Sequence, residues 1–299
     1  MRNKFIHTLT IIFISSIITS SVIAKDIFNF NVTEIEITQN GNVFKGTKGG
    51  EAFTNDGVTI RADYFEYNKI STILISSGDV ILKDKEKNII ITSEKIIYLK
   101  NKEIIIAEGN ARLEDIKKNT VITSDKISFF KNEEKIEALN RVEVKDFELN
   151  TIIKGNKITF FKNPEKVQAE GDVELFENNK DIKIKTNKIT YLKNLEKIYT
   201  EGVARAEIYS KYKLISSDLL FLRNEMKLSS NKKTIIEDNN FSKYEAEEFI
   251  FNINEEFLKG KNISIIQNNN VPIEQSDQFF FQNGFFDLKN QNFKTAKTE

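Results

Sequence analysis

Apolar and polar residues alternate along most of this chain, in runs of about ten residues that are separated by short polar turns. Between residues 104 and 130, for example, two such runs flank a turn. In the first run, Ala111 and Leu113 fall on one side of an extended backbone, and Arg112 and Glu114 fall on the other. This period of two, with many β-branched and aromatic residues, predicts two strands of an antiparallel sheet.

The same pattern recurs every 31 residues, as the step from Gly78 to Gly109 shows. Two short motifs keep this interval without insertion or deletion. The first motif begins at Gly78, Gly109, Asn140, Gly171 and Gly202, and the second begins at Ser93, Ser124, Gly155, Thr186 and Ser217. Weaker copies on both sides extend the series to about seven two-stranded units. Such regularity predicts an elongated array, in which each unit buries its apolar face against its neighbours.

Stacking the units aligns four columns of apolar residues that share one phase and therefore face one way. The column positions that we expect on this common apolar face are Val80, Leu82, Ile96, Tyr98, Ala111, Leu113, Ile127, Phe129, Val142, Val144, Ile158, Phe160, Val173, Leu175, Ile189, Tyr191, Leu220 and Leu222. Their polar neighbours, such as Asn110 and Lys126, are expected on the opposite face. The glycines of the first motif are expected to mark a bend or a close approach of strands. The pattern leaves open whether the apolar side is a packed core or a groove.

Residues 1–24 have the features of a secretory signal peptide. Arg2 and Lys4 are basic, residues 9–18 are mostly apolar, and Ala24 is a small residue before a plausible cleavage site. An uncleaved anchor is the alternative, but an apolar stretch of about ten residues is short of the roughly 20 that span a bilayer. We therefore expect an exported protein with one domain at residues 25–288 and a polar C-terminal tail at residues 289–299.

Composition excludes several kinds of chemistry. The chain has no Cys, and its one His, His7, lies in the leader. Cysteine nucleophiles, Ser-His-Asp triads and the usual ligands of zinc, copper and haem are therefore missing. The carboxylates recur with the repeat, as Glu94 and Asp125 do, which favours structural roles. We expect no enzyme, no catalytic residue, no cofactor and no metal site.

Charge argues against one class of partner. The chain has 44 basic and 44 acidic residues, and loss of the leader with Arg2 and Lys4 leaves a slight acidic excess. The charges alternate finely along the chain instead of gathering in a basic patch. Binding to nucleic acid is therefore not expected.

Three motifs together resemble a known repeat. They are Ala-Asp-x-hydrophobic-x-Tyr at residues 62–67, a recurring Lys-Asn turn, and Ala-Glu-Gly-Asp/Asn-Val/Ala-x-Leu at residues 107–113 and 169–175. The chain resembles the OstA-like family of lipopolysaccharide-transport proteins over nearly its whole length after the leader. This family includes the periplasmic bridge protein LptA and the N-terminal periplasmic domain of LptD.

The resemblance implies an all-β, elongated antiparallel β-jellyroll, folded like a taco shell with open ends. It implies that the eighteen column residues line a groove that carries the acyl chains of lipid A. The implied partners are lipopolysaccharide and other Lpt proteins, joined head to tail by pairing of edge strands. The implied location is the periplasm, in association with the outer membrane through partners.

Two questions stay open at this level. Residues 279–288 resemble the LptD segment that leads to its outer-membrane barrel, so the chain is either a long bridge protein or a truncated or split LptD-like protein with a barrel partner. Its C-terminal aromatic residues favour the second. Another function is also open: a structural or adhesive exported β-repeat protein with a fully packed core. A carbohydrate-active enzyme would need aperiodic acids or aromatics clustered on one outer face, and the sequence has none.

Overall fold

Strands form where the alternating pattern predicts them. The computed structural model describes residues 28–268, 276–290 and 292–295. Within these ranges the strands are β1 (Asn29–Thr38), β2 (Val43–Phe53), β3 (Val58–Ala62), β4 (Tyr64–Asn68), β5 (Ile73–Asp84), β6 (Ile89–Leu99), β7 (Ile104–Asp115), β8 (Thr120–Phe130), β9 (Lys135–Asp146), β10 (Thr151–Lys162), β11 (Glu165–Glu177), β12 (Ile182–Leu192), β13 (Lys197–Ile208), β14 (Tyr212–Ser217), β15 (Leu220–Leu222), β16 (Lys227–Ser230), β17 (Thr234–Asp238), β18 (Lys243–Asn252), β19 (Phe257–Gln267), β20 (Asp277–Asp287) and β21 (Asn292–Thr295). Short 3₁₀ turns lie at η1 (Gln39–Gly41), η2 (Lys100–Lys102), η3 (Asn178–Lys180) and η4 (Lys193–Leu195).

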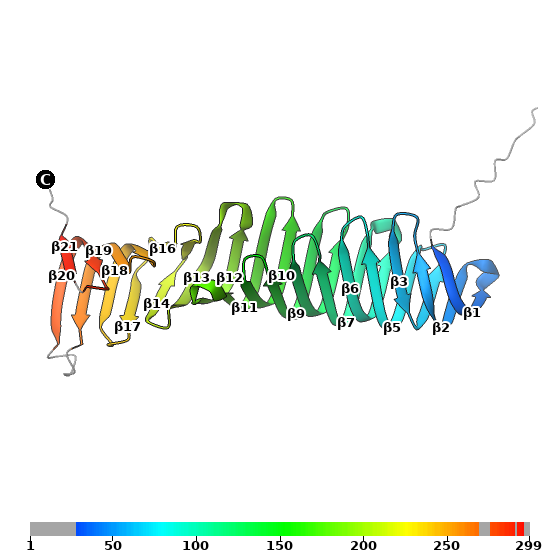
Figure 1. Ribbon diagram of the computed structural model, residues 1–299, viewed down its shortest axis with the longest axis horizontal. Coiled ribbons are helices and arrows are strands. Elements are labelled where there is room, and N and C mark those ends of the chain that lie inside the picture. The colour runs from blue at the N-terminus through cyan, green and yellow to red at the C-terminus, as the bar shows by residue number, and fades with distance from the viewer. Residues whose placement is uncertain (1–27, 269–275, 291, 296–299) are drawn as a thin grey trace, which may run out of the picture.

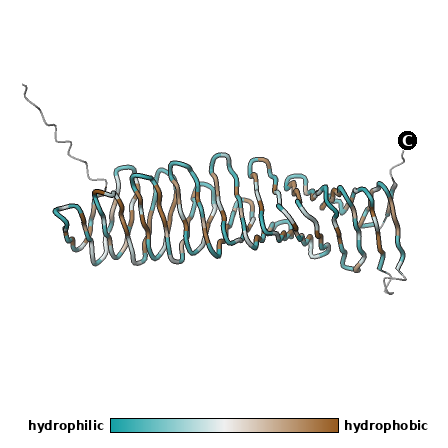
Figure 2. The backbone as a smooth tube through the Cα atoms, turned by 180° about the vertical axis from the view of Figure 1, so that it is seen from behind, coloured by the Kyte–Doolittle hydropathy of each residue, from teal (hydrophilic) through white to brown (hydrophobic). Residues whose placement is uncertain are grey.

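The strands form one long antiparallel meander, as Figure 1 shows. From β5 to β13, each strand pairs with the next one along the chain. In this ladder Ile96 of β6 lies opposite Ala107 of β7, and Ala107 lies opposite Ile127 of β8. Apolar residues are thereby aligned from unit to unit, and brown and teal stretches alternate along the coloured part of the tube in Figure 2. The predicted elongated, all-β antiparallel architecture is confirmed.

The first repeated motif bends every second long strand near its middle, in β5, β7, β9, β11 and β13. Gly78 and Asp79 have φ values of 82° and 42°, and Gly109 and Asn110 have values of 80° and 47°. The pairing of β5 with β6 shifts at the same place, between Ser77 and Val80. A left-handed pair of residues makes a bulge, which kinks a strand. The bends fold the sheet lengthwise, so that the two halves of every strand face each other across a shared interior.

Periodic acids support these bends on the outer face. Asn110 Nδ2 donates to Glu94 Oε1 at 2.7 Å, and the backbone N–H of Gly202 donates to Asp218 Oδ1 at 2.8 Å. Arg141 likewise pairs with Asp125. The expectation that repeated carboxylates are structural is met at these positions.

Two predicted interior positions are wrong. Leu220 and Leu222 are half-buried, whereas their neighbours Leu219 and Phe221 are each only 1% exposed. Leu219 and Phe221 therefore take the two places in the columns. The 31-residue interval contracts to 30 residues at this point in the chain.

The cause is a shorter turn between β13 and β14. Ile208 pairs with Tyr212, which leaves three residues in the turn, whereas Asp146 pairs with Thr151 and leaves four. In the longer turn, Asp146 Oδ1 accepts the backbone N–H of Leu149 at 2.9 Å. Ile208 stands at the equivalent position and has no carboxylate for this bond. A slip of one residue moves the side chains that follow to the other face of a strand.

The predicted termini lie partly outside the described residues. This holds for the signal peptide at residues 1–24 and for the end of the polar tail. Within the tail, however, β21 pairs with β20, where Thr295 lies opposite Gly284. The sheet therefore continues beyond the predicted domain boundary at residue 288. In the described ranges, no helix has the length and apolar character needed to cross a membrane.

Candidate functional site

The interior of the folded sheet is the strongest candidate for a functional site. The predicted column residues that the structure brings together there, each at most 5% exposed, are Val80, Leu82, Ile96, Tyr98, Ala111, Leu113, Ile127, Phe129, Val142, Val144, Ile158, Phe160, Val173, Leu175, Ile189 and Tyr191. They belong to one continuous apolar cluster that runs from Phe28 to Leu288. The apolar surface therefore extends along the whole body and is not confined to one pocket.

This interior is filled by its own side chains. A gap near the middle, bordered by Val144, Phe160 and Tyr191, has a volume of about 20 Å³. A space of that size holds about one water molecule. A hydrocarbon chain therefore fits beside these residues only if the two halves of the sheet move apart.

The C-terminal end of the interior is less tightly filled. A cavity of about 230 Å³ lies there, between β18, β19, β20 and β21. Its lining residues are Tyr244, Ile265, Gln267, Phe279, Phe281, Phe286 and Phe293. Aromatic rings dominate this lining, and Phe281 and Phe293 are stacked with centroids 3.5 Å apart. The cavity is large enough for several methylene groups.

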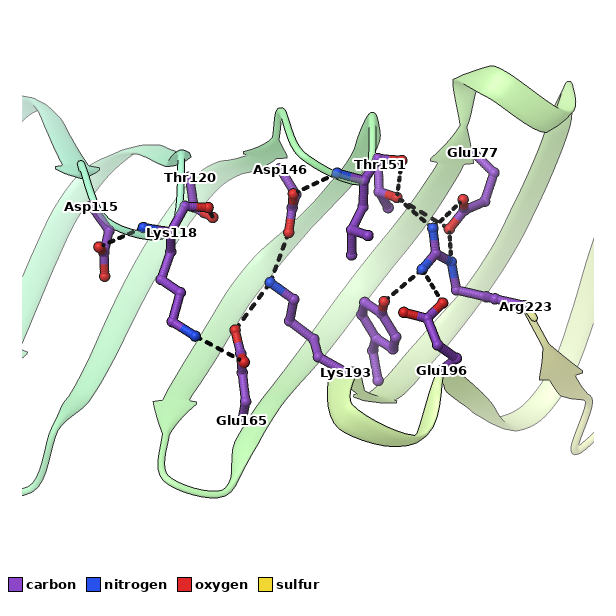
Figure 3. A network of polar contacts seen from close by, with 12 residues as sticks. Asp115, Lys118, Thr120, Asp146, Thr151, Glu165, Glu177, Lys193, Glu196 and Arg223 are labelled. Carbon is purple, nitrogen blue, oxygen red and sulfur yellow. Dashed lines mark hydrogen bonds and ion pairs between the residues drawn. The ribbon is translucent and has the colours of Figure 1, made fainter.

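A row of buried ion pairs closes the side of the interior that lies opposite the bends. Acidic residues at the turns along one rim meet basic residues at the turns along the other. The pairs, with their shortest N–O distances, are Asp84–Lys131 (2.9 Å), Asp115–Lys162 (2.6 Å), Asp146–Lys193 (2.8 Å) and Glu177–Arg223 (2.7 Å). We call these four pairs the ion-pair seam, its carboxylates the acidic rim and its cations the basic rim; Figure 3 shows the last three carboxylates and the last two cations.

The seam joins parts of the chain that are not neighbours in the sheet. Lys193 and Asp146 are 47 residues apart, and Arg223 and Glu177 are 46 residues apart. By contrast, backbone hydrogen bonds join successive turns along the same rim, as from Ile116 N–H to the carbonyl oxygen of Asn88. Each ion pair of the seam, which we call a rung, therefore depends on side chains that reach from one rim to the other.

The carboxylates of the acidic rim divide their oxygens between two tasks. Asp84 Oδ1 accepts the backbone N–H of Lys87 at 3.0 Å, and Asp115 Oδ1 accepts that of Lys118 at 3.1 Å. Their Oδ2 atoms face Lys131 and Lys162 across the seam; these contacts are ion pairs by distance, without the angles of a regular hydrogen bond. One oxygen thus holds the local turn while the other holds the seam.

Arg223 makes the most extensive rung. Its Nε and Nη2 atoms donate to the two carboxylate oxygens of Glu177 at 2.7 and 2.8 Å, and Nη1 donates to Tyr191 Oη at 2.8 Å. Burial alone would lower the pKa of Arg223, but Glu177 and Glu196 outweigh it, so the pKa lies above its ordinary value. The paired, two-oxygen geometry is the strong form of a charge-assisted hydrogen bond.

Nearby carboxylates raise the pKa of Lys131 and Lys193 in the same way. Burial by itself lowers the pKa of Lys193, yet the hydrogen bonds and charges of Asp146 and Glu165 raise it overall. Burial raises the pKa of Glu165, but Lys193 and Lys118 lower it below its ordinary value. Lys193 and Glu165 therefore form a pair of opposite charges, each held in its ionised form by the other.

Sequence reasoning missed the seam, although a signal was present. Asp115 stands two residues after the buried Leu113, and Lys162 stands two residues after the buried Phe160. Both are therefore in the inward phase of their strands. The Lys-Asn motif by itself predicts only a turn and does not show that its lysine points inward. From β5 to β12, the series of inward-facing residues along each strand in fact ends in a charged residue, acidic at one rim and basic at the other.

The described residues offer no metal site. Within the ranges 28–268, 276–290 and 292–295, no group of three or more His, Cys, Asp or Glu side chains is arranged to hold a metal ion.

Comparison with known proteins gives a weak likeness to a solved structure. No protein-family model matches the chain, and no curated protein matches it. Among solved structures, the chain is similar to LptH from Pseudomonas aeruginosa, described as the LptA-homologous periplasmic component of the conserved lipopolysaccharide transport device. The match has 16% identity and a TM-score of 0.37, and it covers 40% of this chain and 94% of LptH. A likeness at this level does not establish what the chain does.

Proposed function

We propose that this protein is a periplasmic lipid-carrying module of lipopolysaccharide transport, which holds acyl chains in the interior of its folded sheet. The observation that carries the proposal is the uninterrupted apolar interior, which runs along the body and ends in an apolar cavity. The motifs of the OstA-like repeat, at their fixed spacing, favour the same function. Moving a methylene group from water into such an interior is favourable by about 0.8 kcal/mol, so the interior favours the binding of acyl chains.

Entry of lipid requires the rims to separate. The rims meet through side chains, whereas each bend is held by the backbone and its bulge. The bends are therefore the natural hinge and the ion-pair seam is the natural opening. Acyl chains would then replace contacts between the two apolar halves, and polar parts of the lipid would lie at the rims.

The two end strands provide edges for partners. On β1, Ile35 and Ile37 are 50% and 55% exposed. On β20, Phe280 is 72% exposed, and the pairing with β21 covers only Gly284 to Asp287. Unpaired strand edges accept strands from other chains. We propose that other Lpt proteins, and on the outer-membrane side a barrel partner, dock at these edges.

Photocrosslinking from the interior tests the proposal. A photoreactive residue at Phe160, which is 4% exposed, would be compared with one at Lys157, which lies on the outer face of the same strand. In living Gram-negative cells we expect a lipopolysaccharide adduct from position 160 and none from position 157. Equal yields from both positions in a folded, exported protein would refute lipid carriage in the interior.

The second candidate is a structural or adhesive exported β-repeat protein. The observation in its favour is the filled interior, where the gap beside Phe160 measures only about 20 Å³. This function predicts no adduct from either position, because the core would never open.

A further inference from the structure

The ion-pair seam places four cations at the border of an apolar interior, two of them buried and two half-buried. Lys131 and Arg223 are 5% and 3% exposed, which is far below what is usual for charged side chains. A buried cation that loses its anion is left with a large desolvation penalty. The rims can therefore part without that penalty only if water or another anion takes the place of the carboxylate, and an anion keeps the cation paired next to an apolar ligand.

We propose that the basic rim is a binding site for the anionic phosphate group of an amphiphile, whose acyl chains occupy the interior. This inference rests on the proposed lipid-carrying function and specifies how the headgroup is held. Each phosphate replaces one carboxylate of the acidic rim, so that the cation keeps a partner throughout. The exchange breaks and forms no covalent bond and needs no cofactor.

The positions of the basic residues suit such a ligand. Lys162 follows the interior residue Phe160 by two positions, so an amphiphile with its chain beside Phe160 has its head beside Lys162. Lys162 Nζ also lies 6.0 Å from the ring centre of Phe129, another interior residue. Apolar and charged groups are thereby adjacent, as they are in an amphiphile.

The acidic rim is built to release the cation without unfolding. Asp115 Oδ1 is held by the backbone N–H of Lys118 at 3.1 Å, while Oδ2 is the atom that faces Lys162. The turn therefore keeps its cap when the contact across the seam is lost. Asp115 acts as a resident anion that competes with the phosphate of the ligand.

Two single substitutions at one rung test this exchange in opposite directions. Asp115→Asn removes the competing charge but can still accept the N–H of Lys118, whereas Lys162→Gln removes the cation. The purified full chain would be titrated with dioleoyl phosphatidic acid and, separately, with the uncharged dioleoylglycerol. For phosphatidic acid we expect about tenfold tighter binding by Asp115→Asn and about tenfold weaker binding by Lys162→Gln, the effect of one charge-assisted hydrogen bond.

Controls separate this mechanism from simple loosening of the seam. Lys157→Gln removes an outward lysine from the same strand and should change neither titration. If the seam were only a latch, Asp115→Asn and Lys162→Gln would shift both lipids in the same direction, and that result would overturn the proposal. Should Lys162→Gln fold poorly, the double variant Asp115→Asn/Lys162→Gln gives an uncharged rung. It should lose the preference for phosphatidic acid over dioleoylglycerol, and an unchanged preference would also overturn the proposal.

Inorganic phosphate distinguishes a headgroup from a free ion. We expect no measurable binding of inorganic phosphate alone, because without acyl chains the seam stays shut. Binding of free phosphate that Lys162→Gln abolishes would overturn the headgroup assignment. Failure of both lipids to bind would instead refute the proposed lipid-carrying function itself.

Discussion

At the scale of single residues, the molecule is distinguished by charges where a core is usually apolar. Asp84, Glu177 and Arg223 are 1%, 1% and 3% exposed, and each faces an opposite charge. Buried ion pairs add little to stability compared with apolar residues of similar shape, but removal of one partner is strongly destabilising. The seam therefore restricts which residues can be changed singly, more than it raises the stability of the fold.

Arg223→Met should show this asymmetry. The change leaves Glu177 buried without its cation, and we expect a loss of about 3–5 kcal/mol in the free energy of unfolding. The double variant Arg223→Met/Glu177→Met replaces the pair with apolar groups and should recover most of the loss. Urea denaturation measures both values. Equal losses in the single and double variants would show that packing, not unpaired charge, is responsible.

Lys193 of the seam and Glu165, its second carboxylate partner, also predict how stability depends on pH. The pKa of Glu165 is lowered below its ordinary value of 4.5, so its contribution is present above pH 4.5 and is lost as the pH falls through the folded-state value. The pKa of Lys193 is raised above 10.5, so its contribution is present below pH 10.5 and is lost as the pH rises further. We expect a plateau between these limits in the urea midpoint. Glu165→Gln should flatten the acidic decline, and an unchanged decline would exclude Glu165 as a cause.

At the scale of elements, the bends decide how a flat meander becomes a closed body. Gly109 and Gly202 both have left-handed backbones, with φ values of 80° and 76°. Their surroundings differ, however. A Cβ atom at Gly109 would lie 2.5 Å from Glu94 Oε2, whereas one at Gly202 would meet nothing within 4 Å.

Alanine at these two glycines should separate backbone strain from crowding. Gly202→Ala should lower the free energy of unfolding by about 1–2 kcal/mol, the cost of a left-handed L-residue. Gly109→Ala should lower it further, because Glu94 must also move. Urea denaturation of the matched pair gives the difference. Equal losses at the two sites would show that the neighbours of Gly109 yield without strain.

At the scale of the whole molecule, each strand contacts mainly the strands beside it, and the ladder is weakest near β14 to β17. These strands have 6, 3, 4 and 5 residues, whereas β7 and β9 have 12 each. In an array of this kind, stability is the sum of units and their interfaces. The short strands therefore mark a place where the C-terminal part can open separately.

Hydrogen exchange should reveal this division. We expect amide protons of β7 to β10 to exchange slowest, and those of β14 to β17 to exchange faster by at least an order of magnitude. Peptides from β18 and β19 should show a level of protection from exchange that differs from that of β7 to β10. Uniform protection from β5 to β19 would mean that the body opens as one unit.

Much of this architecture can be predicted from the sequence. Local alternation marks β7 and β8 almost to the residue, and the repeated glycines mark the bends. The pairing of Asp115 with Lys162 cannot be inferred in the same way, because it depends on how far the folded halves are offset. The phase error at Leu220 and Leu222 has a local origin. A three-residue turn after Ile208 carries no strong sequence mark, and one missing residue is enough to exchange the faces.

The offset of the seam has a consequence for the size of the molecule. Asp146 lies at the turn after β9, and its partner Lys193 lies at the turn after β12. One ion pair of the seam therefore spans three strands, β10 to β12, and 47 residues of chain. A single 31-residue module is too short to contain both partners of such an ion pair. Closing the folded sheet therefore needs several modules, and below a minimum length the acidic rim and the basic rim stay apart. A fragment shorter than about one and a half modules would leave these acids and bases without counterparts, and no ion pair of the seam would join its two rims.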